Sequence, residues 1–155
     1  MSTKQERLNR MDLLLLLLLA DGNKGPNEPI EGKTRLQKQL FLSQKNLTDD
    51  IKIDKPYSFR PYHYGPYCKD IYSDIDLLKE DGIIQEDEKT DNYDGIVRVF
   101  SLTHKGVAEV QATISTPVRQ QQFEIIRSVK KKFNGMSVVD LVDYTHKAYA
   151  DYVGP

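Results

Sequence analysis

The side chains best suited to metal binding or nucleophilic chemistry are three histidines and one cysteine in a chain of 155 residues. His63, His104 and His146 are scattered and lack the short spacing of His, Asp and Glu that forms a zinc site. Cys68 has no second cysteine for an internal disulfide, and a single cysteine is typical of a reducing, cytoplasmic setting. The sequence contains no nucleophile elbow, phosphate-binding loop or dinucleotide-binding glycine motif. We therefore expect a non-enzymatic protein that holds neither a metal nor another cofactor.

The most distinctive polar stretch lies at residues 62–67 and combines three tyrosines, a histidine and a Gly-Pro pair. The Gly-Pro pair predicts the start of a helix, because proline in the first turn loses no intrahelical hydrogen bond. Such a helix start can bind an anion through its backbone N–H groups, with His63 and Arg35 as candidate contributors. The alternative, which we favour, is that the tyrosines pack the helix start against a basic helix at residues 33–46. The residues of the stretch are Tyr62, His63, Tyr64, Gly65, Pro66 and Tyr67.

Charge is separated along the chain, although the total of −1 excludes strong overall attraction to nucleic acid or to an anionic membrane. Residues 66–95 contain three lysines and ten carboxylates, which gives this span a charge of −7 and leaves +6 on the rest. Phosphate groups repel such a surface, so we expect this span to contact a protein partner. The candidate protein-binding residues are Asp70, Asp74 and Glu80, which we expect to lie away from the apolar face of their helix.

Basic residues gather outside the acidic span, on the predicted helix at 33–46 and at residues 127–132. Each cluster taken singly is typical of a solvated helix face. Together they support an alternative function, in which the chain binds nucleic acid through these basic helices. The candidate nucleic-acid-binding residues are Lys33, Arg35, Lys38, Arg127, Lys130, Lys131 and Lys132.

Near its N-terminal end the sequence contains seven consecutive leucines, Leu13 to Leu19. The apolar run extends over only about ten residues, whereas a membrane-spanning helix needs roughly 20, so we expect no membrane span. The Asp-Gly-Asn-Lys-Gly-Pro sequence that follows predicts a helix end and a loop rather than a signal-peptide cleavage site. A helix that is apolar on all sides must be covered on all sides. We expect a central buried helix, or one that also contributes to a homodimer interface.

The remaining pattern predicts a second helix at 33–46, a third helix from Pro66 to Gly82 and a β-hairpin at about 83–102. Spacing along the third helix places Cys68 on an apolar face with Ile71, Ile75 and Leu78, which predicts a buried, inert thiol. Three further helices are expected at about 104–152. Their start signals are Thr103, the Thr116-Pro117 pair and Ser137.

Several short motifs, in order, resemble those of the SocA-like (Panacea-type antitoxin) domains and the YwgA-like proteins. Residues 32–42 are similar to the K-L-Q-K-L-L-Y helix of these families, and residues 62–67 with Ile71-Tyr72 resemble their Y-G-P helix start. Further likenesses lie at residues 77–84, at 102–106 and at 144–146. The resemblance implies a winged-helix-like α+β domain whose relatives act as antitoxins or proteolysis adaptors by binding proteins. It marks Arg35, Leu36, Lys38 and residues 62–67 as family-motif positions.

Together these observations predict an α+β, mostly helical protein with a winged-helix-like core, a two-stranded β-hairpin wing and additional C-terminal helices. We expect residues 1–155 to form a single domain, with the wing at about 83–102 and the C-terminal helices at about 104–152. The expected function is protein binding in an antitoxin-like, defence-associated or regulatory complex. The alternative is a DNA-binding transcriptional regulator that uses its basic helices.

Overall fold

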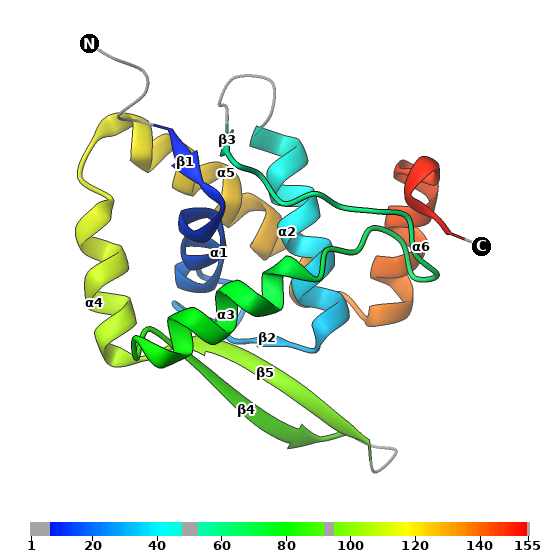
Figure 1. The fold of residues 1–155 in the computed structure, drawn as a ribbon, viewed down its shortest axis with the longest axis horizontal. Helices are drawn as coiled ribbons and strands as arrows, with labels where there is room; N and C mark the ends of the chain where they lie inside the picture. The colour runs from blue at the N-terminus through cyan, green and yellow to red at the C-terminus, as the bar shows by residue number, and fades with distance from the viewer. Residues whose placement is uncertain (1–6, 48–52, 92–94, 155) are drawn as a thin grey trace.

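The computed structural model describes residues 7–47, 53–91 and 95–154. Six α-helices and five short strands lie in these ranges, so the chain is α+β and mostly helical, as the sequence predicts (Figure 1). The helices are α1 (Arg10–Leu19), α2 (Lys33–Leu47), α3 (Asp70–Glu80), α4 (His104–Thr113), α5 (Pro117–Phe133) and α6 (Val138–Ala148). The strands are β1 (Leu8–Asn9), β2 (Ile30–Glu31), β3 (Ile53–Asp54), β4 (Ile84–Thr90) and β5 (Ile96–Leu102). No helix within these ranges has the length and apolar character needed to cross a membrane.

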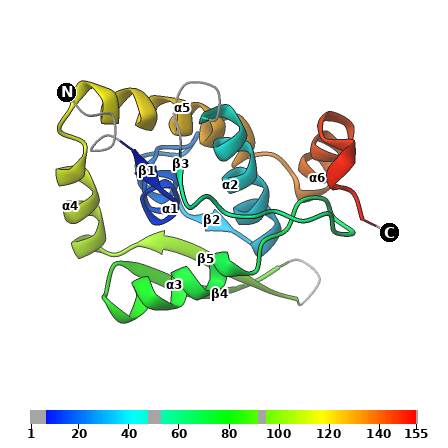
Figure 2. The ribbon, with the colours of Figure 1, turned by 45° about the horizontal axis from the view of Figure 1, so that its top comes forward.

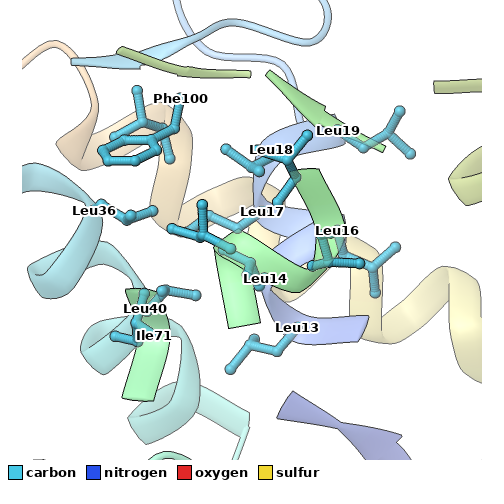
Figure 3. Close-up of a cluster of buried hydrophobic side chains, with 14 of the residues drawn as sticks. Leu13, Leu14, Leu16, Leu17, Leu18, Leu19, Leu36, Leu40, Ile71 and Phe100 are labelled. Carbon is cyan, nitrogen blue, oxygen red and sulfur yellow. The ribbon is translucent and has the colours of Figure 1, made fainter. Parts of the chain in front are cut away.

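The leucine helix α1 forms the centre of the molecule. Asn9 caps it by accepting a hydrogen bond from the Asp12 backbone N–H at 2.8 Å. Six of the seven leucines are buried, and Leu15 is partly buried. Helices α2, α4 and α5 together with strand β5 surround α1, and Figure 3 shows its leucines meeting Leu36, Leu40, Ile71 and Phe100. The expectation of a central buried helix is confirmed, and other parts of the same chain provide the cover.

The β-hairpin at the lower edge of Figure 1 consists of β4 and β5, paired antiparallel from Ile84↔Leu102 to Thr90↔Ile96. Residues 92–94 at its tip lie outside the described residues. The predicted hairpin is confirmed, but the sequence did not indicate that β2 joins it. Strand β2 pairs with the other side of β5 through Ile30↔Phe100, which makes a three-stranded sheet in the order β2-β5-β4. Strands β1 and β3 form a separate parallel pair.

The C-terminal helices begin where their capping residues predict. Thr103, Thr116 and Ser137 each accept a backbone N–H hydrogen bond from three residues further along. Helix α5 packs along both α1 and α2, whereas α6 lies at the opposite end of the molecule from α4 (Figure 2). A single 3₁₀ turn, Ala150–Tyr152, follows α6.

The third helix begins later than the Gly-Pro pair predicts, so that prediction is wrong. Helix α3 begins at Asp70, and Tyr67 before it forms an isolated β-bridge with Arg60. Tyr67 and Arg60 exchange two backbone hydrogen bonds of 2.8 and 3.0 Å. The Gln37 side chain accepts from the Cys68 N–H at 2.9 Å and donates to the Cys68 carbonyl at 2.8 Å. These contacts use the backbone groups that a helical turn would need, so tertiary structure overrides the local signal.

Candidate protein-interaction surface

The outward side of α3 carries a group of carboxylates and an exposed leucine. Ile71, Ile75 and Leu78 face the core, which leaves Asp76, Leu77 and Glu80 on the opposite side. Leu77 is 54% exposed, although it is a large apolar residue in the middle of a helix. Asp81 follows directly and is also exposed. We call Asp76, Leu77, Glu80 and Asp81 the acidic α3 surface.

Two carboxylates of the neighbouring hairpin, Glu86 and Glu88, differ because cations lie beside them. Glu86 lies 3.3 Å from the Lys79 ammonium, and Glu88 lies 2.6 Å from the Arg98 guanidinium. Among the described residues, none of the three carboxylates of the acidic α3 surface has an ion-pair partner. Glu86 and Glu88 thus differ from the three carboxylates of the acidic α3 surface in having an ion-pair partner.

The position of these carboxylates is unfavourable for the helix itself. The carboxyl end of a helix carries a partial negative charge, and Glu80 and Asp81 lie at that end of α3. Asp76 and Glu80 are also four residues apart, at which distance like charges repel each other across one helix turn. The stability of the helix therefore does not favour this arrangement of charges.

Asp74, one of the three candidate protein-binding residues, lies inside the molecule, so its expected surface position is wrong. Only 2% of the residue is exposed. Its carboxylate accepts a hydrogen bond of 2.8 Å from the Tyr57 hydroxyl and lies 2.9 Å from the Arg10 guanidinium. Burial, together with this hydrogen bond, raises the pKa of the Tyr57 hydroxyl above its usual value. Asp74 therefore joins α3 to α1 and to the segment before α3.

The other two candidates are accessible. The Asp70 side chain is half-exposed at the first turn of α3 and lies 3.9 Å from Arg10. Glu80 is exposed and belongs to the acidic α3 surface. Asp76, Leu77 and Asp81 complete that surface but were not among the candidates. The signal for Asp76 and Leu77 was available in the sequence, because they fall between positions 75 and 78, which face the core. Asp81 lies three residues after Leu78, so this spacing did not indicate its exposure.

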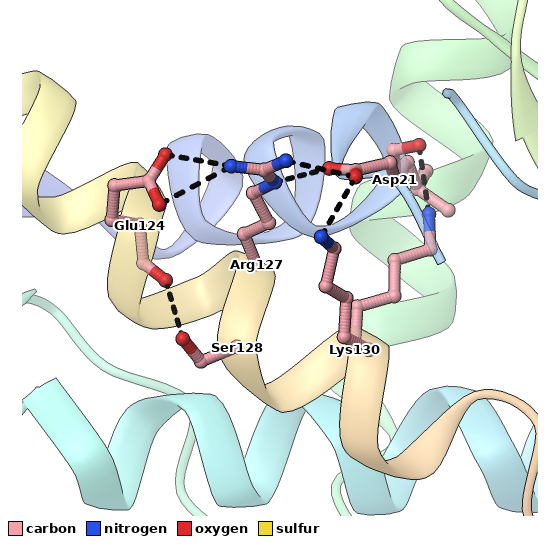
Figure 4. A network of polar contacts seen from close by, with 7 residues as sticks. Asp21, Glu124, Arg127, Ser128 and Lys130 are labelled. Carbon is pink, nitrogen blue, oxygen red and sulfur yellow. Dashed lines mark hydrogen bonds and ion pairs between the residues drawn. The ribbon is translucent and has the colours of Figure 1, made fainter. Parts of the chain in front are cut away.

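Two of the candidate nucleic-acid-binding residues are buried, so their interpretation as a solvated face is wrong. Lys130 is fully buried, and its ammonium donates a hydrogen bond of 3.1 Å to the Leu18 carbonyl at the end of α1 (Figure 4). Lys38 is buried within α2 and donates to the Pro66 carbonyl at 3.0 Å. Burial lowers the pKa of Lys130 to about 7 and that of Lys38 to about 8. Neither ammonium group is available to a phosphate.

The remaining basic candidates contact other parts of the chain. Arg127 pairs with Asp21 and Glu124, and Lys131 lies 3.4 Å from the same Asp21 (Figure 4). The hydrogen bond from Arg127 is the main cause that lowers the pKa of Asp21 to about 2. Arg35 donates hydrogen bonds of 3.1 Å to the carbonyls of Met136 and Glu31. The ammonium groups of Lys33 and Lys132 lie over aromatic rings, those of Tyr72 and of Phe133 and Tyr144.

The family-motif positions meet at one junction between α2, the segment before α3, and α6. Gly65 has a φ of +100°, which favours glycine. A methyl group added to it would lie 3.3 Å from Lys38 Cε and 3.3 Å from Thr145 Oγ1. Lys38 also holds Pro66, as described above, and Leu36 is in the core. These motif positions therefore build the junction between three segments that are distant in sequence.

The tyrosine stretch does not form the expected helix start, so the proposed anion site at that helix start is not present. The N–H groups of Tyr67 and Cys68 are already bound, to Arg60 and to Gln37. Tyr62 stacks on Tyr67 with ring centres 5.1 Å apart. Arg35 contacts other residues, as described above, and His63 is exposed beside Tyr62. The alternative, in which this segment packs against the basic helix, agrees with the contacts of Lys38 and Gln37.

Comparison with known proteins identifies the family. Among the described residues, no group of three or more His, Cys, Asp and Glu side chains is placed to hold a metal ion. A search of curated proteins gives no match. The family model described as "Antitoxin SocA-like, Panacea domain" matches residues 36–150, which extend from α2 through α6 and include the acidic α3 surface. Because this match covers most of the chain, the protein belongs to the SocA-like antitoxin family with the Panacea domain.

Proposed function

We propose that this chain is a non-enzymatic, antitoxin-like module that binds a protein partner through the acidic α3 surface. The observation that carries the proposal is the group of three carboxylates around the exposed Leu77. None of them has an ion-pair partner among the described residues, and two of them lie where a negative charge destabilises the helix. Their expected partner is a protein surface that supplies lysine or arginine together with an apolar contact.

We further propose that residues 1–155 form one domain with a winged-helix-like core. Helices α1, α2 and α3 followed by the β4–β5 hairpin support this arrangement, as does the third strand, β2, which extends the sheet. In DNA-binding helix-turn-helix proteins the helix equivalent to α3 enters the major groove. Here that helix carries unpaired carboxylates, which phosphate groups repel. The geometry thus favours a protein over DNA as the partner of α3, in the cytoplasmic setting that the single free Cys68 suggests.

The test compares co-purification by two variants that lose the same amount of charge. The first variant, Asp76→Asn with Glu80→Gln and Asp81→Asn, neutralises the acidic α3 surface. The matched control, Asp140→Asn with Asp143→Asn and Asp151→Asn, neutralises three exposed carboxylates on and after α6. Tagged full-length proteins are expressed in the native host, and partners are recovered with and without nuclease treatment.

We expect a protein partner that survives nuclease and is recovered with the wild type and the α6 control, but at least tenfold less with the α3 variant. Equal recovery with the α3 variant would show that α3 does not carry the contact. Loss of all partners after nuclease treatment would favour the nucleic-acid alternative.

A further inference from the structure

An apolar pocket of about 240 Å³ opens between α1, α3 and α4, beside the acidic α3 surface. Leu15 and Leu16 of α1 line it, together with Leu78, Ile83 and Val110. Leu16, Leu78, Ile83 and Val110 are buried core residues. The pocket therefore reaches the hydrophobic core from the surface.

Three carboxylates stand around this apolar pocket: Asp12, Asp81 and Glu109. Asp12 is 3.6 Å from the Arg119 guanidinium, so an internal cation partly neutralises it. Asp81 and Glu109 have no ion-pair partner among the residues that the structure describes. Lys105 is nearby, but its ammonium donates to the backbone carbonyl of Asp81 at 2.8 Å. The pocket thus combines an apolar interior with two free negative charges at its entrance.

The size of the pocket indicates what it can hold. Sites for drug-sized ligands and cofactors have volumes of about 300–1,000 Å³, and this pocket is smaller. Its volume suits one aliphatic or aromatic side chain. Asp81 belongs both to the pocket and to the acidic α3 surface, so one bound partner can contact the surface and the pocket at the same time.

We propose that this pocket receives an apolar side chain of the protein partner, while neighbouring lysine or arginine residues of the same segment contact Asp81 and Glu109. The occupant is a basic, apolar-anchored segment of a protein. This inference rests on the proposed function and specifies the chemistry of the partner. An apolar anchor in a desolvated pocket with charged groups at the rim is the usual arrangement of an interface hot spot.

The experiment uses a random dodecapeptide phage library selected against the immobilised full-length protein, followed by fluorescence anisotropy with the selected peptides. Two variants alter the pocket from exposed positions, so the fold is retained. Thr113→Trp fills it from the rim, and Glu109→Lys reverses one entrance charge. Glu124→Lys, an equal charge reversal on the exposed side of α5, is the matched control. Thermal unfolding of each variant verifies that it is folded.

We expect the selected peptides to combine an apolar residue with lysine or arginine within four positions. We expect them to bind Thr113→Trp and Glu109→Lys at least tenfold more weakly than the wild type, with Glu124→Lys within twofold of the wild type. Replacing the apolar residue of a selected peptide with serine should weaken its binding by a similar factor. The proposal is overturned if the selected peptides lack this combination, or if they bind both folded pocket variants as tightly as the wild type.

Recovery of the natural partner by the α3 variant and by the pocket variants distinguishes a failure of this inference from a failure of the proposed function. If the α3 neutralisation variant loses the partner while Thr113→Trp and Glu109→Lys retain it, the pocket proposal fails and the proposed function stands. If the α3 variant retains the partner, the proposed function fails, and the peptide measurements alone decide the pocket.

Discussion

At the scale of single residues, the chain buries charges in two different ways. Asp74 lies between the Tyr57 hydroxyl and the Arg10 guanidinium, so its charge is compensated. Lys130 donates to a backbone carbonyl and has no carboxylate within ion-pair distance among the described residues. The first arrangement holds elements together, whereas the second opposes folding to the extent that the ammonium group must lose its water.

Removal of Asp74 should strongly destabilise the protein. We expect Asp74→Ala to lower the free energy of unfolding by about 3–5 kcal/mol, because it leaves the Arg10 charge without its closest partner and the Tyr57 hydroxyl without its acceptor. Asp76→Ala, two residues along the same helix but exposed, should change it by no more than about 0.5 kcal/mol. Urea unfolding of the two variants measures the difference. Similar losses for both variants would contradict the internal role of Asp74.

The buried Lys130 should make stability depend on pH. Its pKa is about 7 in the folded protein and 10.5 when exposed in the unfolded chain. Between these values the unfolded chain binds more protons, so the free energy of unfolding rises as the pH rises. The burial cost is fully present below pH 7. One such group adds at most about 1.4 kcal/mol per pH unit to the slope of the free energy of unfolding against pH. We expect Lys130→Met to remove most of this contribution.

Lys38 provides the comparison for this measurement. Its pKa is about 8, so it contributes to the same slope only above that pH. Urea unfolding at pH 6.5, 7.5, 8.5 and 9.5 should show a flatter profile for Lys130→Met from pH 7 upward, and for Lys38→Met from pH 8 upward. A profile for Lys130→Met that is parallel to the wild type would show that folding does not lower the pKa of Lys130.

At the scale of elements, the leucine helix gives the clearest contrast between neighbouring positions. Leu16 is buried in the core, whereas Leu15 is only partly buried. We expect Leu16→Asp to abolish soluble folded protein, because an unpaired buried charge costs several kcal/mol and a small domain has about 5–15 kcal/mol of stability. Leu15→Asp should fold with a lower melting temperature. Soluble expression and circular dichroism distinguish the two, and a folded Leu16→Asp protein would contradict the buried helix.

The two ends of α3 should respond to charge removal with opposite signs. Asp70 lies in the first turn, where a negative charge is favourable, and Glu80 lies in the last turn, where it is unfavourable. We expect Glu80→Gln to stabilise and Asp70→Asn to destabilise the protein, each by about 0.3–1 kcal/mol at low salt. Thermal unfolding at 20 mM and 1 M NaCl should show both effects shrinking as the charges are screened. A loss of stability in Glu80→Gln would contradict the argument that Glu80 is retained for binding.

The elements were predictable where their signals are local. Caps at Thr103, Thr116 and Ser137 bind backbone groups three residues away, so the sequence alone places these helix starts. The predicted start of α3 was wrong because the side chain of Gln37, more than 30 residues earlier, binds the backbone N–H and carbonyl of Cys68. The short strand β2 was missed because its pairing partner in β5 is still more distant in sequence.

The candidate site was only partly predictable, because a charged residue type suggests exposure even where the helical spacing places the residue on a buried face. Asp74 lies at the helical interval between Ile71 and Leu78 that marks a buried face. Lys130 occupies the same kind of interval between Ile126 and Phe133. A charged side chain at such a position indicates a buried polar contact, and this signal was present in both helices. Which partner satisfies the charge depends on packing between helices and is not encoded locally.

At the scale of the whole molecule, the junction at Gly65 joins α2, the segment before α3, and α6. An added methyl group there meets Lys38 and Thr145 at 3.3 Å, whereas at Gly25 nothing lies within 4 Å. Both glycines have a positive φ, so each substitution to alanine strains the backbone. We expect Gly65→Ala to be more destabilising than Gly25→Ala by about 1–3 kcal/mol, because only the former overpacks a junction. Chemical unfolding of both variants tests this. Equal losses of the free energy of unfolding would show that α6 can move to accommodate the added methyl group without loss of stability.

The order of the chain has a consequence for how this protein is made. The ribosome releases the leucine helix first, yet α5, one of the helices that cover it, ends only at Phe133. At a synthesis rate of about 5–20 residues per second, the side of the leucine helix that α5 covers stays exposed for roughly 5–20 s. An uncovered apolar run of this kind is a binding site for chaperones and a starting point for aggregation. Any interruption of translation before α5 therefore leaves a fragment that the cell must sequester or degrade.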